Sequence, residues 1–200
     1  IVLDVKDTER LRATINEAAT KRGRLDAIFA NAGISAGPGF AFGPAGGLEG
    51  VQLAAWQNVL DINPTSVLVS LQTAAPHMKA RRYGRMVVTA SIAGLRSEPF
   101  VGYAYAATKA AVANVVRHAA TELAPFNISV NAIAPGAFMT NIAGGRLKLP
   151  EVAAQFAQMS PMKRIASTDE MKGLILLLGS PAASFLTGQA IAIDGGAMAS

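Results

Sequence analysis

A tyrosine and a lysine stand four residues apart at Tyr105 and Lys109, in a segment whose apolar residues have helical spacing. Side chains at i and i+4 project from one face of a helix, so the ammonium group would lie near the phenol. Lowering a tyrosine pKa from about 10 to near 7 requires roughly 4 kcal/mol of differential interaction, which Lys109 and a bound cationic ring could supply. The pair therefore predicts a phenol that transfers a proton near neutral pH.

A serine hydroxyl precedes this pair at Ser91, directly after an apolar run over residues 86–90. If the three side chains face one crevice, they can polarise a carbonyl group and deliver a proton to it. Tyrosine and lysine also reach this spacing by chance, and an exposed pair on a helix surface is the alternative interpretation.

The apolar pattern predicts the elements that must position these side chains. Strands that are apolar throughout are typical of a parallel sheet buried on both faces. We therefore predict an α/β fold, a doubly wound parallel sheet in a Rossmann-like three-layer α/β/α arrangement, with the 200 residues forming a single domain. The expected helices are residues 8–22, 53–82, 103–123 and 168–178, and the expected strands are 1–5, 25–30, 86–90, 128–133 and 190–193.

Ligands of such sheets bind beyond the carboxyl ends of the strands. Those ends fall at Asp4 and at residues 31–33, 91–94 and 135–140, and each is followed by glycine or a small polar residue. The long loop over residues 35–50 is rich in glycine and proline, and a loop of this kind beside a rigid scaffold often carries binding.

Composition excludes several classes of protein. With 51% hydrophobic and 16% charged residues the chain is not disordered, and no apolar run reaches the roughly 18 residues of a membrane span. The basic cluster over residues 79–85 is interpreted as a solvated helix end, with a phosphate-binding patch as the alternative, so we expect no nucleic-acid partner. His77 and His118 predict no metal site, and the absence of cysteine fits a cytoplasmic protein.

Five motifs in order resemble one known family. Residues 89–94 (TASIAG) and 105–109 (YAATK) resemble the short-chain dehydrogenase/reductase family, whose active site is a serine followed by Tyr-x-x-x-Lys. The remaining landmarks are NAG at residues 31–33, Asn63, NAIAPG at 131–136 with Thr140, and TGQ at 187–189 leading to DGG at 194–196. The resemblance covers essentially the whole chain.

The resemblance implies a role for each matching residue. Tyr105 would be the general acid and base, Ser91 would hold the substrate oxygen, and Lys109 would lower the tyrosine pKa and bind the nicotinamide ribose. Tyr103 is a competing tyrosine, but no lysine lies four residues beyond it. Asn63 would hold a water in the proton relay. The cofactor would contact Asp4, at the adenine, and Asn31, Ala32, Gly33, Tyr105, Lys109, Pro135, Gly136 and Thr140.

The activity that the resemblance implies is an NAD(P)-dependent oxidoreductase that interconverts a secondary alcohol and a ketone. The alternatives are a non-catalytic dinucleotide-binding or scaffold protein, an inactive fragment and, more remotely, a halohydrin-type lyase, whose members have arginine where Lys109 stands. The residue that selects NAD or NADP is not identified. A homo-oligomer, tetramer or dimer, is expected through the helices over residues 56–82 and 103–123.

Two features depart from the family pattern. Pro64 follows Asn63, and proline removes an amide donor and disfavours helical geometry in the residue before it. The glycine-rich phosphate loop of the family, with its surrounding strand-helix-strand-helix segment, is not among these 200 residues. We expect that the natural protein is longer than this sequence; a fragment with no activity of its own is the alternative.

The substrate pocket is expected to be apolar. Residues 141–166 occupy the family's variable region, and we expect a lid in which Ile142, Leu147 and Leu149 close over the substrate. Ser91 and Phe138 are predicted to line the pocket, and simple loop packing is the alternative for Phe138 and for the other candidates. These candidates are Phe40, Phe42, Glu98, Phe100 and Met139.

Overall fold

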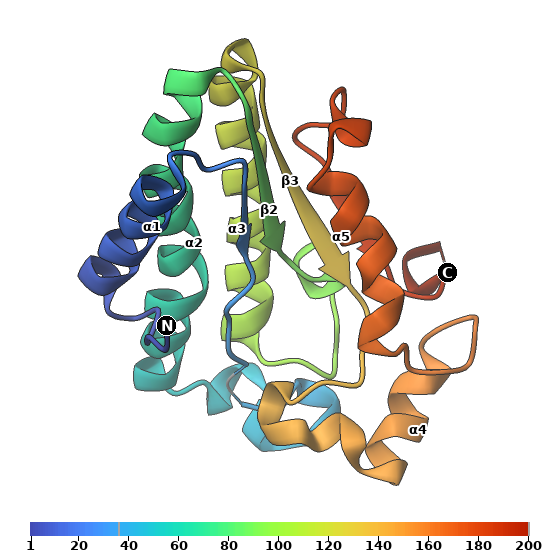
Figure 1. Ribbon diagram of the computed structural model, residues 1–200. Coiled ribbons are helices and arrows are strands. Elements are labelled where there is room, and N and C mark those ends of the chain that lie inside the picture. The colour runs from blue at the N-terminus through green and yellow to red at the C-terminus, as the bar shows by residue number, and fades with distance from the viewer. Residues whose placement is uncertain (36, 200) are drawn as a thin grey trace.

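The computed structural model describes residues 1–35 and 37–199 and has one parallel sheet at its centre (Figure 1). Its strands, in spatial order, are β1 (Ala27–Ala30), β2 (Gly84–Thr89), β3 (Ile128–Pro135) and β4 (Ala190–Ile193). Neighbouring strands all pair in parallel, with Val88 of β2 opposite Ala132 of β3. The predicted parallel α/β sheet is confirmed.

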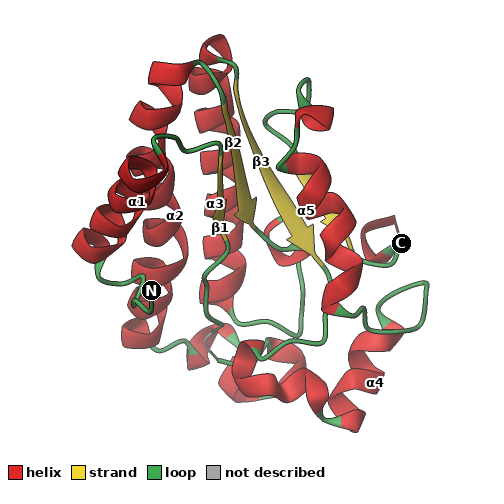
Figure 2. Ribbon diagram, in the orientation of Figure 1, coloured by secondary structure: helices red, strands yellow, loops and turns green. Residues whose placement is uncertain are grey.

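Helices cover both faces of the sheet (Figure 2). On one face α2 (Leu53–Arg81) and α3 (Tyr103–Leu123) pack against the strands, and α1 (Thr8–Arg22) packs on α2. On the other face lies α5 (Lys172–Leu178), while α4 (Pro150–Gln158) lies beyond the strand ends. No helix in the described parts of the chain is both long and apolar enough to cross a membrane.

Strand β2 shows why the sheet is buried on both sides. Successive side chains of a strand point to opposite faces. Met86 and Val88 join the core beneath α2 and α3, whereas Val87 joins a second core with Leu178 of α5. All of these residues are at most 3% exposed. The continuous apolar run of β2 is therefore what a central strand between two helical layers requires.

The predicted strand over residues 1–5 is wrong. Ile1 and Val2 are 85% and 100% exposed, and the backbone of Asp4 accepts the amide of Asp7 in a turn that leads into α1. A strand is stable only when its backbone groups pair with a neighbour, and within the described residues β1 pairs with β2 alone. The apolar run has no pairing partner there.

The helix predicted over residues 168–178 is also shorter than expected. Its first turn, Thr168–Met171, is a 3-10 helix, and α5 begins only at Lys172. Ser167 and Glu170 form a reciprocal capping box at the start of this turn, and Arg164 holds the Glu170 carboxylate with two hydrogen bonds of 2.8 and 2.6 Å. These hydrogen bonds lower the pKa of Glu170 to about 2, with Arg164 as the main cause.

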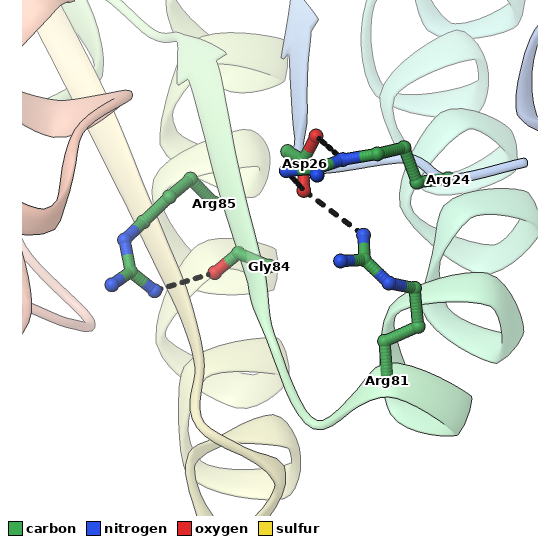
Figure 3. A network of polar contacts seen from close by, with 5 residues as sticks. All are labelled: Arg24, Asp26, Arg81, Gly84 and Arg85. Carbon is green, nitrogen blue, oxygen red and sulfur yellow. Dashed lines mark hydrogen bonds and ion pairs between the residues drawn. The ribbon is translucent and has the colours of Figure 1, made fainter. Parts of the chain in front are cut away.

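A polar network ties the amino end of the sheet to α2 (Figure 3). The carboxylate of Asp26 accepts hydrogen bonds from Arg24, at 2.6 and 2.7 Å, and from Arg81 at the end of α2, at 2.9 Å. The hydrogen bond from Arg24 is the main reason why the pKa of Asp26 is lowered. Arg85 is only 2% exposed and donates to the carbonyl of Gly84 at 2.8 Å. This network lies at the opposite end of the strands from the residues that could do chemistry.

Candidate active site

Ser91 lies just beyond the carboxyl end of β2, at the start of a short 3-10 turn over Ile92–Gly94. It is 7% exposed, and its hydroxyl accepts the amide of Ala93 at 3.2 Å. A Cβ on Gly94 would lie 2.4 Å from the backbone of Lys109, so only glycine lets this turn pack directly on α3. The contact sets Ser91 beside the residues of α3.

Tyr105 and Lys109 occupy the first two turns of α3 and are both buried. They are 9% and 4% exposed, and the Nζ atom of Lys109 lies 5.6 Å from the centroid of the Tyr105 ring. The Ser91 hydroxyl lowers the pKa of the phenol, against the larger effect of burial, which raises it. Tyr103 is 38% exposed and does not line the cavity that contains Ser91 and Tyr105. The structure therefore brings Ser91, Tyr105 and Lys109 together as the sequence predicted, and leaves Tyr103 outside.

The electrostatics of this trio differ from the expectation for Tyr105. Burial raises the pKa of Tyr105 above its ordinary value, so in the protein without a bound cationic ring there is no net lowering of the phenol pKa. Burial also lowers the pKa of Lys109, to about 8. The reason is that both groups lose water on burial, which penalises phenolate and ammonium alike. A cationic ring bound beside the phenol would act in the opposite direction.

Lys109 connects the trio to the residues that follow β1. Its Nζ atom donates to the backbone carbonyl of Thr89 at 2.7 Å, and the Thr89 hydroxyl donates to Oδ1 of Asn31 at 2.9 Å. A Cβ on Gly33 would lie 3.2 Å from Oδ1 of Asn63 and 3.5 Å from Nζ of Lys109. The segment 31–33 therefore passes directly over the buried lysine.

Asn63 fixes this segment to two helices. Its Oδ1 atom accepts the amide of Ile34 at 2.8 Å, and its Nδ2 atom donates to the carbonyl of Ile34 at 2.9 Å and to Oγ1 of Thr108 at 3.1 Å. Both amide hydrogens are thereby used within the protein. The side chain of Asn63, 1% exposed, holds the loop after β1 against α2 and α3.

Pro64 interrupts the hydrogen bonding of α2 without ending the helix. Proline has no N–H for the carbonyl of Leu60, but the hydroxyl of Thr65 donates to that carbonyl at 3.0 Å. The helix runs from Leu53 to Arg81 through this position. Thr65 thus replaces the hydrogen bond that Pro64 removes.

This compensation predicts a specific double-mutant result. Thr65→Val should lower the free energy of unfolding by about 1–2 kcal/mol, because it leaves the Leu60 carbonyl without a donor. In a Pro64→Leu background, the restored backbone N–H can serve that carbonyl, and Thr65→Val should cost clearly less. Urea unfolding of the four proteins gives the comparison. An equal cost in both backgrounds would show that Thr65 does not compensate for Pro64.

The ends of β3 and β4 form the opposite side of the site. A Cβ on Gly136 would lie 2.9 Å from the Cα atom of Asp194, so glycine permits the close approach of these two segments. Phe138 is 4% exposed and, with Pro135 and Gly136, lines the same cavity as Ser91 and Tyr105. Thr140 does not line this cavity, and its hydroxyl accepts the amide of Ile142 at 3.3 Å.

Asp4 is the predicted site residue that the structure places apart. It is exposed and does not line the cavity. Its carboxylate accepts the amide of Lys6 at 2.9 Å in the turn before α1. Its assignment depended on a strand end at residues 1–5, and that strand does not form.

The cavity has a volume of about 350 Å³, in the range of small-molecule sites, and lies beyond the carboxyl ends of β2 and β3. In Figure 1 the arrowheads of β2 and β3 point toward the segment that contains α4. Most of the lining is apolar and comes from residues far apart in sequence. It includes Phe42, Phe100, Val101, Phe138, Ile142, Leu147, Val152, Phe156, Met159, Met162 and Ile193.

The predicted pocket residues are partly correct. Phe42, Glu98, Phe100, Phe138, Ile142 and Leu147 line the cavity. Phe40, Met139 and Leu149 do not, and they are 49%, 42% and 47% exposed. Sequence analysis missed Phe156, although its spacing of four from Val152 marks the inner face of α4. The Phe156 ring packs against Phe100 with centroids 5.4 Å apart and the ring planes tilted by 50°.

The residues around Lys109 fit the nicotinamide and ribose half of a dinucleotide. Gly33 and Gly136 have no side chain, so a ligand can approach the backbone there. The hydroxyl groups of Ser91 and Tyr105 and the ammonium group of Lys109 lie in the same region. The glycine-rich loop between β1 and α2 passes through three short 3-10 turns before the helix begins, so within residues 1–35 and 37–199 a short glycine loop leading directly from a strand into a helix, as a pyrophosphate cradle requires, is not part of this fit.

Comparison with known proteins agrees with this geometry. Residues 1–198 match the family model described as enoyl-(acyl carrier protein) reductase. The chain is 38% identical over 198 residues to cis-4-hydroxycyclohexanecarboxylate dehydrogenase of Sinomonas cyclohexanicum, an alignment that covers 96% of this chain and 74% of that protein.

Two solved structures have nearly the same backbone. ElxO with NADP bound superposes with a TM-score of 0.89 at 30% identity, over 99% of this chain and 77% of ElxO. A 3-oxoacyl-[acyl-carrier protein] reductase of Brucella melitensis with bound NAD superposes with a TM-score of 0.83 at 34% identity, over 98% of this chain and 70% of that one. With the Ser91, Tyr105 and Lys109 arrangement, these matches show that the chain belongs to the short-chain dehydrogenase/reductase family.

Proposed function

We propose that the protein is an NAD(P)-dependent oxidoreductase that interconverts a secondary alcohol and a ketone, with Tyr105 moving the proton. One observation carries the proposal. Ser91 and Tyr105 line a single, mostly apolar cavity, and the ammonium group of Lys109 is buried 5.6 Å from the centroid of the tyrosine ring. This is the arrangement that polarises a carbonyl oxygen and protonates it.

In the direction of ketone reduction, the Ser91 hydroxyl donates a hydrogen bond to the substrate carbonyl oxygen. The Tyr105 phenol gives its proton to that oxygen as the carbonyl group is reduced to a secondary alcohol. When bound, the nicotinamide supplies the hydride for this carbon, or accepts it in the reverse direction. In alcohol oxidation the Tyr105 phenolate takes the hydroxyl proton, and the charge of Lys109 stabilises that phenolate.

The proposal assigns the remaining predicted residues to cofactor and substrate. Asn31, Ala32, Gly33, Lys109, Pro135, Gly136 and Thr140 would contact the cofactor, and residues 141–166 would form a lid of the single domain. The exposed Leu68 on α2 and Ala110 and Ala111 on α3 support a homo-oligomer formed through these helices. The cytoplasmic location remains a prediction of the sequence alone, and the proposal covers NAD and NADP alike.

An assay of the full-length protein tests the proposal. Cyclic secondary alcohols are the first substrates to try, since a relative 38% identical is named for a hydroxycyclohexanecarboxylate. We expect reduced nicotinamide to appear, measured by its absorbance, with NAD⁺ or NADP⁺, and Ser91→Ala to lower kcat/KM by roughly 100-fold or more. Tight binding of the dinucleotide without turnover of any alcohol or ketone would instead indicate a non-catalytic binding protein.

A further inference from the structure

The charged residues of the cavity are nearly all neutralised or held within the protein. Glu98 is paired with Arg96 at 2.7 Å, and Arg164 is paired with Glu170 at 2.6 Å. Asp194 also lines the cavity, and its carboxylate accepts hydrogen bonds from the backbone amides of residues 196 and 198 at 3.0 and 2.7 Å. The two ion pairs carry no net charge, whereas the Asp194 carboxylate keeps its charge and is held by backbone amides.

Arg146 is the exception among the described residues that line the cavity. No carboxylate of the described chain lies within ion-pair distance of its guanidinium group, which instead lies 5.0 Å from the centroid of the Phe42 ring. Phe42 in turn contacts Phe100 edge to face, with centroids 5.4 Å apart. The guanidinium group of Arg146 therefore lies against the aromatic side chains of the cavity, without a carboxylate partner among the described residues.

The local backbone places this side chain at the opening of the cavity. Ala143, Gly144 and Gly145 are all left-handed, with φ of 53°, 69° and 77°, and they turn the chain between Ile142 and Arg146. Ile142, Arg146 and Leu147 consequently all line the cavity, although Arg146 is exposed to solvent and Leu147 is buried. Arginine in such a position can bind a carboxylate with two parallel hydrogen bonds.

Building on the proposed function, we infer that Arg146 binds a carboxylate group of the substrate. The preferred substrates are then hydroxy acids and oxo acids in which an apolar ring or chain separates the carboxylate from the reacting carbon. The apolar part would contact Phe42, Phe100 and Phe156, while the reacting oxygen would reach Ser91 and Tyr105. A neutral alcohol of the same shape would lack the contact with Arg146.

A matched pair of substrates isolates this contact in the full-length protein. We expect Arg146→Gln to raise KM for 4-hydroxycyclohexanecarboxylate roughly 10- to 100-fold, the range for a hydrogen-bonded charge, and to change KM for the corresponding carboxamide less than about twofold. Arg146→Lys keeps the positive charge but cannot donate two parallel hydrogen bonds, so its KM for the carboxylate should lie between those of the unmodified protein and Arg146→Gln. Lys21→Gln is the control, because Lys21 is also exposed, lies at the end of α1 and does not line the cavity.

Three results would overturn the inference. An equal rise in KM for the carboxylate and the carboxamide would indicate a general distortion of the pocket, and no change for either would remove Arg146 from recognition. A rise in KM for the dinucleotide would indicate that the guanidinium binds a cofactor phosphate instead.

A binding measurement separates this inference from the proposed function. Calorimetric titration with cyclohexanecarboxylate needs no turnover, so it reports on Arg146 even if the protein oxidises no alcohol. Weaker binding to Arg146→Gln than to the unmodified protein supports the inference in either case, and equal binding contradicts it.

Discussion

Tyr105→Phe is expected to lower kcat for every accepted alcohol by roughly a thousandfold, within the range that a general acid and base contributes. The substitution removes one hydroxyl and leaves the ring in its buried position on α3. The substrate oxygen would still meet the Ser91 hydroxyl, but nothing at that position could give or take its proton. Steady-state kinetics with saturating cofactor measures the effect.

The sequence offers a closely matched control for this substitution. Tyr103→Phe makes the same chemical change two residues earlier on the same helix, at a side chain that is 38% exposed and outside the cavity. We expect it to leave kcat within about twofold, as for a surface substitution. If Tyr105→Phe keeps full turnover, or if both variants lose activity alike, Tyr105 is not the proton-transferring group.

Lys109→Met is expected to abolish activity and at the same time to stabilise the protein without cofactor. Burial lowers the pKa of Lys109 from 10.5 to about 8, which corresponds to about 3 kcal/mol of cost for burying the ammonium group. The substitution also leaves the Thr89 carbonyl without its donor, at a cost of about 1 kcal/mol. The first effect is larger, so the free energy of unfolding should rise by about 2 kcal/mol at neutral pH.

The pH dependence follows from the direction of this shift. Below pH 8 both the folded and the unfolded protein carry the proton, and the folded state bears the full cost. Between pH 8 and 10.5 the unfolded state binds more protons, so the contribution of Lys109 to stability rises with pH. The advantage of Lys109→Met should therefore be largest near pH 7 and shrink toward pH 10.5.

Urea unfolding at pH 7 and pH 10, together with the assay, tests both parts of this prediction. Lys21→Met provides the control, since Lys21 is exposed at the end of α1 and its replacement should change stability by no more than about 0.5 kcal/mol. A destabilised Lys109→Met at pH 7 would mean that the ammonium group is not penalised by burial. Retained activity would remove Lys109 from the proposed mechanism.

Local patterns in the sequence predict most of the secondary structure. The bounds of α1, α3 and β4 agree with the apolar pattern, because burial of one side of a helix imposes a helical period of apolar residues, and a strand between two helical layers is a continuous apolar run. The buried position of Ser91, Tyr105 and Lys109 follows similarly, since strand ends and helix starts of a parallel sheet meet at one edge.

Residues 1–5 show where such patterns fail. An apolar run records that side chains avoid water, but it does not specify whether another strand is available to pair with its backbone. The direction of the Tyr105 pKa shift likewise does not follow from a local pattern. Spacing indicated a nearby lysine, whereas the shift depends on how much water both groups lose.

The sequence by itself determined the parallel sheet, the order of β1 to β4 and the pair of Tyr105 and Lys109, because each rests on periodicity or on short spacing along one element. Ser91 joins this pair because the end of β2 and the start of α3 meet at one edge of the sheet. Only the tertiary structure decided the cavity. Phe42, Phe100 and Phe156 come from three separate segments, and Arg146 reaches the same wall through a left-handed turn. Contacts between residues so far apart in the chain depend on how the segments pack, and no local pattern encodes that packing.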